Sequence, residues 1–236
     1  MKKQIFTAVL AGLTGSLLAA DTSAKDEVVA AAKKLGESAN YGWKMTVAVP
    51  ESAQIKPGPT EGKTEKDGYT HARISFRDNT IEMAKKGDKV AFTNPDGDWQ
   101  TPADVEGEQG PGRFMAGMAR NFKVPAAQAV EVAQATKELK KDGDVYSGDL
   151  TEEGAKNLMR FRRGGGGDGG PTISDAKGSA KFWVKDGVLT KYEYKLKGSM
   201  DFNGNNIDVD RTSTVEIKDV GNTKVEVPEG AKKKLS

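Results

Sequence analysis

The sequence predicts an α+β fold in which an antiparallel sheet is covered by helices, and three observations lead to this prediction. Apolar and polar residues alternate, as in half-buried strands, over much of 41–93 and again over 180–217. Between these parts, residues 114–159 place apolar side chains at helical spacing. A sheet of alternating strands has one apolar face, and that face needs a cover. The central helices are therefore expected to pack on the sheet.

Residues 1–20 have the features of a secretory signal peptide. A pair of lysines follows the initial methionine, and residues 5–20 are uncharged and end in small side chains. This run is shorter than the roughly 20 predominantly apolar residues that a membrane-spanning helix needs. We therefore expect cleavage after Ala20, with Ala24 as the alternative, and a single exported domain over 21–236.

Composition excludes several classes of function. The chain has no cysteine, so disulfides, thiolate chemistry and lipid attachment through a lipobox cysteine are excluded. It carries 36 basic and 34 acidic residues, and removal of the signal peptide with its two lysines leaves a neutral domain. Nucleic-acid-binding proteins concentrate basic charge on one face. We expect a periplasmic or secreted protein with no nucleic-acid partner and no transmembrane segment in its mature chain.

The N-terminal part predicts one helix followed by a meander of strands. Residues 26–38 have apolar side chains at helical spacing, whereas residues 41–49 alternate. Residues 51–68 are rich in Pro, Gly, Lys and Glu, so we expect a mostly solvated segment with at most an irregular edge strand. Turn-forming residues divide the next stretch into three expected strands. These strands are 69–77, 79–86 and 88–93.

A strongly apolar stripe marks the first central helix. Phe114, Met118 and Phe122 lie at positions i, i+4 and i+8, with Met115 beside them. Because these side chains share one helix face, we expect that face to lie against the sheet. Two interpretations of the stripe stay open at this point. The stripe either completes a filled core or lines an adaptable apolar cavity, which suits the flexible thioether of methionine.

Two further helices, a strand and a loop follow. Pro125 is suited to the first turn of a second helix. A short strand over 144–149 precedes Thr151, which can cap a third helix. Residues 164–170 comprise six glycines and one aspartate. We expect them to form a flexible linker or a long loop within the domain.

The C-terminal part shows the most regular alternation. Residues 180–184 alternate as far as the Asp-Gly pair at 186–187, which favours a two-residue hairpin. Eight alternate positions of 188–202 then hold uncharged residues in one phase. The other phase holds Lys191, Glu193, Lys195 and Lys197, with Leu189 as the exception. Residues 225–227 suggest a last short strand. Long hairpins with one apolar face are therefore expected.

One irregularity concerns the strand expected over 207–217. Its apolar residues share one face, but Arg211 and Ser213 fall in the same phase. A buried guanidinium has to be paired or has to contact a polar ligand. A β-bulge that turns Arg211 outward would remove this requirement. We expect the bulge, and the alternative is a buried polar contact made by Arg211.

No set of residues with the chemistry of an enzyme stands out. His71 is the only histidine, and we expect it at the surface or rim of its strand. Without a second histidine or a cysteine, zinc sites and Ser-His-Asp or Cys-His arrangements have no basis. The start of a calcium loop at 201–205 lacks the later glycine and glutamate, so we expect a polar hairpin tip. The sequence predicts no metal, no cofactor and no catalysis.

Two stretches and the order of elements resemble a known family. Residues 182–192 contain a Trp, an Asp-Gly turn, an apolar residue and a basic strand, and residues 212–228 end in Val-x-Val-Pro. They resemble the LolA/LolB-like superfamily of lipoprotein carriers and its LppX/LprG-type lipid-binding relatives. The resemblance spans roughly 39–235 and concerns structural motifs, without a match to a ligand-contacting residue. The chain departs from the family in its glycine-rich loop and in the absence of the lipidation cysteine.

The resemblance implies a curved, unclosed sheet, a LolA-like half-barrel whose concave face is covered by helices. In the relatives the space between sheet and helices admits acyl chains. The expected lining of this cleft is Trp43, Met45, Phe114, Met115, Met118, Phe122, Tyr192 and Tyr194.

The function expected from the sequence is therefore the non-enzymatic binding of a lipid or a lipoprotein acyl chain. The alternative is a structural or protein-interaction module with a filled core and no ligand. Such a module would dock an envelope protein through a sheet edge or through residues 51–68.

Overall fold

The structure is a computed structural model that describes most of the chain. The described residues are 23–53, 56–76, 79–107, 110–160, 171–202 and 204–236. The predicted signal peptide and the glycine-rich loop at 164–170 lie outside them.

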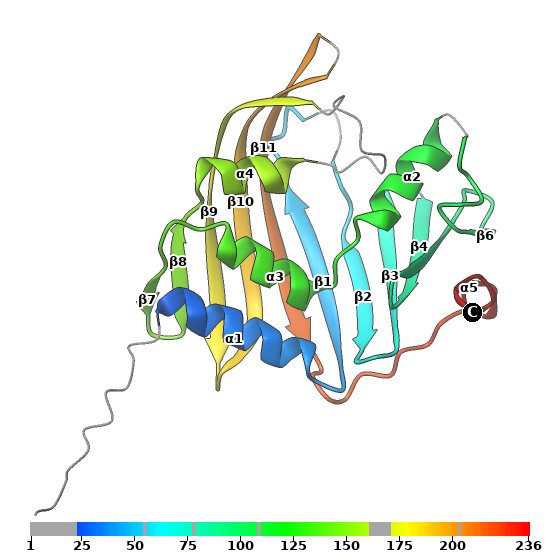
Figure 1. Ribbon diagram of the computed structural model, residues 1–236, viewed down its shortest axis with the longest axis horizontal. Helices are drawn as coiled ribbons and strands as arrows, with labels where there is room; N and C mark the ends of the chain where they lie inside the picture. The colour runs from blue at the N-terminus through cyan, green and yellow to red at the C-terminus, as the bar shows by residue number, and fades with distance from the viewer. Residues whose placement is uncertain (1–22, 54–55, 77–78, 108–109, 161–170, 203) are drawn as a thin grey trace, which may run out of the picture.

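The strands of the described part join in a single antiparallel sheet. Their bounds are β1 (Asn40–Ala48), β2 (Thr60–Glu65), β3 (Tyr69–Phe76), β4 (Asn79–Lys86), β5 (Lys89–Thr93), β6 (Trp99–Gln100), β7 (Lys140–Asp142), β8 (Val145–Asp149), β9 (Thr172–Lys185), β10 (Val188–Phe202) and β11 (Asn205–Lys218). Their order in the sheet is β6-β5-β4-β3-β2-β1-β11-β10-β9-β8-β7 (Figure 1). Within the described residues the outer strands β6 and β7 do not pair with each other, so the sheet is open. The predicted curved, unclosed antiparallel sheet is confirmed.

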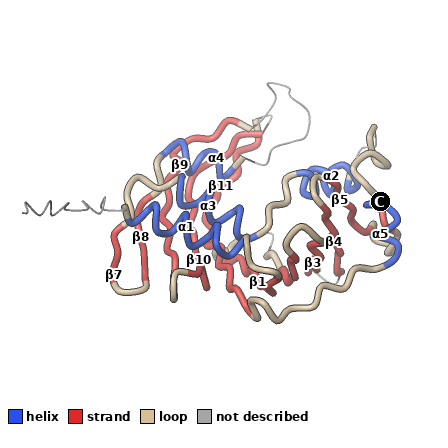
Figure 2. The backbone as a smooth tube through the Cα atoms, turned by 60° about the horizontal axis from the view of Figure 1, so that its bottom comes forward, coloured by secondary structure: helices blue, strands red, loops and turns tan. Residues whose placement is uncertain are grey.

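Four helices of the described part cover one face of the sheet. The helices of the described part are α1 (Ala24–Gly36), α2 (Pro111–Arg120), α3 (Pro125–Gln134), α4 (Glu152–Met159) and α5 (Glu229–Leu235). Figure 2 shows α1, α3 and α4 over one half of the sheet and α2 over the other half. α1 and α4 pack on β9 and β10, α3 packs on α1 and α4, and α2 packs on β5. The helical cover predicted from the central segment is present.

Local chemistry explains where two of these helices begin. The side chain of Ser23 accepts a hydrogen bond from the backbone N–H of Asp26 and caps α1. Thr151 caps α4 in the same way, accepting from the N–H of Gly154 at 2.9 Å, as the sequence predicted. Each cap satisfies an N–H group that has no partner inside its helix.

The concave face buries two groups of apolar side chains. The larger group lies under α1, α3 and α4 and includes Leu35, Phe182 and Tyr192. The smaller group lies between α2 and the strands β4 and β5, and includes Met83 and Phe92. The two groups define the two halves of the molecule, and the candidate site lies between them.

The start of β10 departs from the predicted phase. The register between β9 and β10 shifts between Leu189 and Lys191, which is a β-bulge. As a result Leu189 is fully buried and Thr190 is exposed, so the phase predicted for this end of the strand is wrong. The preceding turn is as predicted. Asp186 and Gly187 have φ of 53° and 70°, and such positive values suit a two-residue hairpin turn.

Residues 51–68 contain a strand that lies inside the sheet. β2 pairs with β1 on one side and with β3 on the other, so the expectation of a solvated segment with an edge strand is wrong. The buried positions of β2 are Thr60 and Thr64. Because threonine is polar but β-branched, it fits a strand without producing an apolar alternation.

The chain ends in a helix on the opposite face of the sheet. The last strand expected at 225–227 is absent, and α5 follows this segment. Ala231 and Leu235 of α5 pack against Ala84, which points away from the face that Met83 occupies. The sequence pattern missed α5 because the helix is short and shows few apolar residues among its lysines.

Candidate ligand-binding cavity

A cavity of about 970 Å³ lies between the concave face of the sheet and the helices α2, α3 and α4. Ligand-binding clefts generally measure about 300–1,000 Å³, so this cavity has the size of a binding site. Its floor is largely apolar. The main apolar side chains of the floor are Trp43, Met45, Val47, Ile74, Met83 and Val215.

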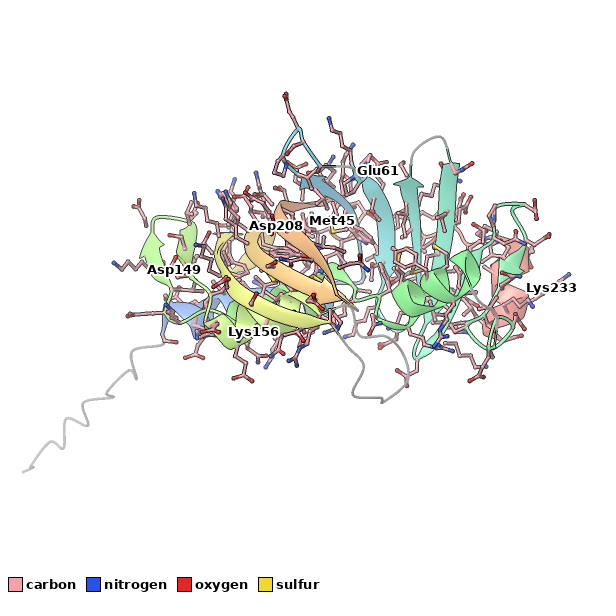
Figure 3. The ribbon with its side chains drawn as sticks, turned by 90° about the horizontal axis from the view of Figure 1, so that it is seen from above. Met45, Glu61, Asp149, Lys156, Asp208 and Lys233 are labelled. Atoms are coloured by element: carbon pink, nitrogen blue, oxygen red, sulfur yellow. The ribbon has the colours of Figure 1, made fainter. Side chains whose placement is uncertain are left out.

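The register of the sheet aligns part of this floor. Tyr192, Val215, Met45, Thr60 and Ile74 are successive cross-strand partners from β10 to β3. Since directly paired residues point to the same face, this row runs across the concave side. In Figure 3 Met45 lies between the labelled Asp208 of β11 and Glu61 of β2, near the middle of the sheet. The apolar floor is thus a product of strand pairing.

Trp43 is held firmly at one side of the floor. Its indole Nε1 donates a hydrogen bond to Thr64 Oγ1 at 3.1 Å. Its partner across the strand pair is Gly62, where a Cβ would lie 2.2 Å from the indole ring. The ring of Phe122 lies beside the indole, with 6.1 Å between the two ring centroids. The absence of a side chain at Gly62 therefore lets the indole lie flat on the strand.

The apolar stripe of the first central helix divides between cavity and core. Phe114 and Met118 line the cavity, and the side chain of Phe114 is 60% exposed. Ala116 and Ala119 are buried against β5, and Met115 packs with them. Helical geometry explains the division, because neighbouring positions in an α-helix point in different directions.

Six of the eight predicted lining residues lie on the cavity, and two do not. Those on the cavity are Trp43, Met45, Phe114, Met118, Phe122 and Tyr194. Met115 belongs to the small core, and Tyr192 is fully buried under α3. The hydroxyl of Tyr192 donates to Gln128 Oε1 at 2.6 Å, and burial raises its pKa. That any of the six contacts a ligand stays a prediction.

Arg211 faces the cavity, so the expected bulge is wrong. β11 pairs with β10 without a register shift through Arg211 and Ser213, and Ser213 also pairs with Val47 of β1. Both side chains line the cavity, and Ser213 is only 2% exposed. Arg211 Nη2 donates to the carbonyl oxygen of Leu158 at 3.3 Å, close to the end of α4. A cation is favourable at a helix C-terminus, so Arg211 holds α4 against the sheet.

Basic side chains surround the cavity, and the sequence pattern did not reveal them as a group. The group consists of Lys85, Arg113, Arg120, Lys123, Arg160 and Arg211. Among the described lining residues Glu131 is the one carboxylate, and it pairs with Lys123 at 2.6 Å. Part of this arrangement has a sequence signal, since Arg113 and Arg120 are two turns apart beside Phe114.

The single histidine lies away from the cavity. His71 pairs across β3 and β4 with Ala84, whose side chain contacts α5 on the opposite face. His71 Nε2 lies 2.7 Å from Glu82 Oε2, and its side chain is 13% exposed. In the described part of the chain, no cluster of His, Asp or Glu residues is arranged to hold a metal ion. No helix in that part is long and apolar enough to cross a membrane.

Comparisons with known proteins concern the fold alone. No family model matches the sequence, and no curated protein matches it. LprF from Mycobacterium bovis is similar in structure with a TM-score of 0.45 and 12% identity, over 88% of this chain and 96% of that chain. The lipoprotein LppX from Mycobacterium tuberculosis is similar with a TM-score of 0.47 and 10% identity, over 86% and 97%.

Proposed function

We propose that this protein is an exported, non-enzymatic binding protein that holds a lipid or another acyl-chain amphiphile in the cavity between sheet and helices. The observation that carries the proposal is the apolar floor of a cavity of about 970 Å³. Each methylene group moved from water to an apolar surface contributes about 0.8 kcal/mol. An acyl chain is therefore a ligand whose affinity such a floor can supply.

The side chains at the cavity suit a flexible chain. Met45, Met83 and Met118 all line it, and a thioether can change rotamer to fit an irregular partner. Phe114 leaves most of its ring uncovered at the cavity. Cover from a bound hydrocarbon would remove that apolar surface from water.

The proposal is tested by the lipid that accompanies the purified protein. Mass spectrometry of a denaturing extract should detect an amphiphile in stoichiometric amount. Met118→Trp should lower this amount, because the larger side chain fills part of the cavity. Ile207→Trp is the matched control, since Ile207 is 54% exposed and lies outside the cavity. A wild-type extract without lipid, or equal lipid in both variants, would contradict the proposal.

The alternative function as a protein-docking module has less support. β2, in the segment considered for docking, pairs on both sides and offers no free edge. The outer strands β6 and β7 span two and three residues, and such short edges are poor templates for a partner strand. Capture of a stoichiometric envelope protein by lipid-free protein would favour this function instead.

Export depends on the predicted signal peptide, and the start of α1 bears on its cleavage site. Cleavage after Ala24 would remove Ser23, which caps α1. Cleavage after Ala20 would keep the cap, whose loss generally costs about 1 kcal/mol. We therefore expect the mature protein to begin at Asp21. Intact mass of protein recovered from an exporting cell measures this, and a start at Lys25 or an unprocessed chain would be the contrary result.

A further inference from the structure

Unmatched positive charge is concentrated at the cavity. Among the described residues, six basic side chains line it against one carboxylate, Glu131, although the chain as a whole carries nearly equal numbers of acids and bases. Elsewhere in the described part, lysines form short ion pairs on the surface. Examples are Lys44 with Glu61, Lys141 with Glu27, and Lys197 with Asp210. The described lining of the cavity thus carries an excess of positive charge, whereas the chain as a whole is nearly neutral.

Four of the basic groups make no ion pair with a carboxylate of the described residues. Lys85 Nζ donates to the carbonyl oxygen of Phe122 at 3.4 Å, and Arg120 Nη2 donates to that of Pro102 at 3.1 Å. Arg113 and Arg160 form no ion pair within the same part of the chain. A carbonyl oxygen carries no formal charge, so these positive charges remain available to an anion.

The four groups come from distant parts of the sequence and converge on one cavity. Lys85 points inward from β4, Arg113 and Arg120 belong to α2, and Arg160 follows α4. An inward lysine on a strand next to buried Met83 and Phe92 is unfavourable unless its charge is used. The N–H donors of arginine in particular match the oxygens of planar carboxylate groups and of tetrahedral phosphate groups.

We infer that the ligand is an anionic amphiphile, with its hydrocarbon chain on the apolar floor and a phosphate or similar anionic headgroup among the basic side chains. The inference rests on the proposed function and narrows it to one chemical class. Charge complementarity selects the headgroup, whereas the apolar floor supplies the affinity for the chain.

The experiment compares two single-chain lipids that differ in the charge of the headgroup. Delipidated full-length mature protein is titrated calorimetrically with lysophosphatidylglycerol and with an uncharged monoacylglycerol of equal chain length, below their critical micelle concentrations. We expect wild type to bind the anionic lipid at least about tenfold more tightly at low salt, as charge-assisted hydrogen bonds predict. Added salt should reduce this preference, because partly exposed charges are screened.

Two variants separate the headgroup from the chain. Arg113→Gln combined with Arg160→Gln should abolish the preference, because the anionic headgroup loses two of its basic partners. Arg73→Gln is the matched control, because Arg73 is an exposed arginine adjacent to Ile74 and points to the opposite face. The control should keep the wild-type preference.

The outcomes distinguish this inference from the function on which it rests. Equal affinity for both lipids, or an unchanged preference in the double variant, would overturn the anionic headgroup and leave lipid binding in place. Binding of neither lipid by wild type would overturn the proposed function itself. Inorganic phosphate bound as tightly as the anionic lipid would identify a free anion as the ligand and would also overturn the inference.

Discussion

Gly62 and Trp43 form a contact on which the cavity floor depends. They are cross-strand partners, and the indole occupies the space that a side chain at Gly62 would need. The same indole is fixed by its hydrogen bond to Thr64 and lies beside Phe122. A single missing methyl group thus determines how the aromatic part of the floor is positioned.

We expect Gly62→Ala to lower the free energy of unfolding by about 1–3 kcal/mol, as overpacked sites generally do. Urea denaturation measures the change. Gly117→Ala is the matched control, because a Cβ at this helical position meets nothing within 4 Å. This second change should be neutral or should stabilise by up to about 1 kcal/mol, since alanine favours a helix. Equal destabilisation by both variants would contradict the contact between Gly62 and Trp43.

Among the elements, α1 is attached to the β7–β8 hairpin by a small polar cluster. Glu27 Oε2 accepts hydrogen bonds from Lys141 Nζ at 2.6 Å and from Tyr146 Oη at 2.5 Å. These bonds hold the pKa of Glu27 below its ordinary value, and the bond from Lys141 has the largest effect. The carboxylate form is therefore favoured in the folded protein, and the attachment of α1 depends on pH.

The sign of this dependence follows from the lowered pKa. The stabilising contribution of Glu27 is fully present above the ordinary carboxyl pKa of about 4.3. It is lost as the pH falls through the lower pKa of the folded state. We expect Glu27→Gln to lower the Tm at pH 7 and the difference from wild type to shrink below about pH 4. Thermal melts across this range measure it.

Glu51→Gln serves as the control for this pH series. Glu51 is exposed and lies in the turn after β1, away from the cluster. Its Tm should follow that of wild type at every pH. A Glu27→Gln difference that persisted unchanged at low pH would show that the cluster acts through packing and not through charge.

At the scale of the whole molecule, the cavity separates two halves of the concave core. Phe122 packs against both the larger and the smaller group of buried side chains. Beyond this residue, α2 is attached mainly through the small residues Ala116 and Ala119. A bound chain would add contacts to both halves at once, so ligand removal should loosen α2 more than the rest.

We expect removal of the lipid to accelerate amide hydrogen exchange in α2. Addition of the lipid should slow this exchange again. The free energy of unfolding should rise on binding, by about 2.7 kcal/mol at a ligand concentration 100-fold above Kd. Exchange mass spectrometry and thermal melts measure the two effects. α5 is an internal control because it packs on the opposite face. Equal changes in α2 and α5, or none in either, would contradict this coupling.

The sequence by itself determined most of the secondary structure and the fold class. Alternation over β3–β5 and β9–β11, the Asp-Gly turn at 186–187 and the cap at Thr151 are local features, and each was predicted from a few neighbouring residues. The apolar stripe on α2 was also predicted from the sequence. The sequence did not show that Phe114 would line the cavity while Met115 would pack in the core.

Only the tertiary structure decided which face each strand residue meets and which distant residues share the cavity. The concave position of Arg211 depends on the unbroken register of β11 with β10, and the position of α5 depends on the buried Ala84 and Ala91 of β4 and β5. Lys85 and Arg160 meet at one cavity although 74 residues separate them in the chain. Strand pairing and helix packing act between segments far apart in sequence, and for this reason no local pattern reveals their result.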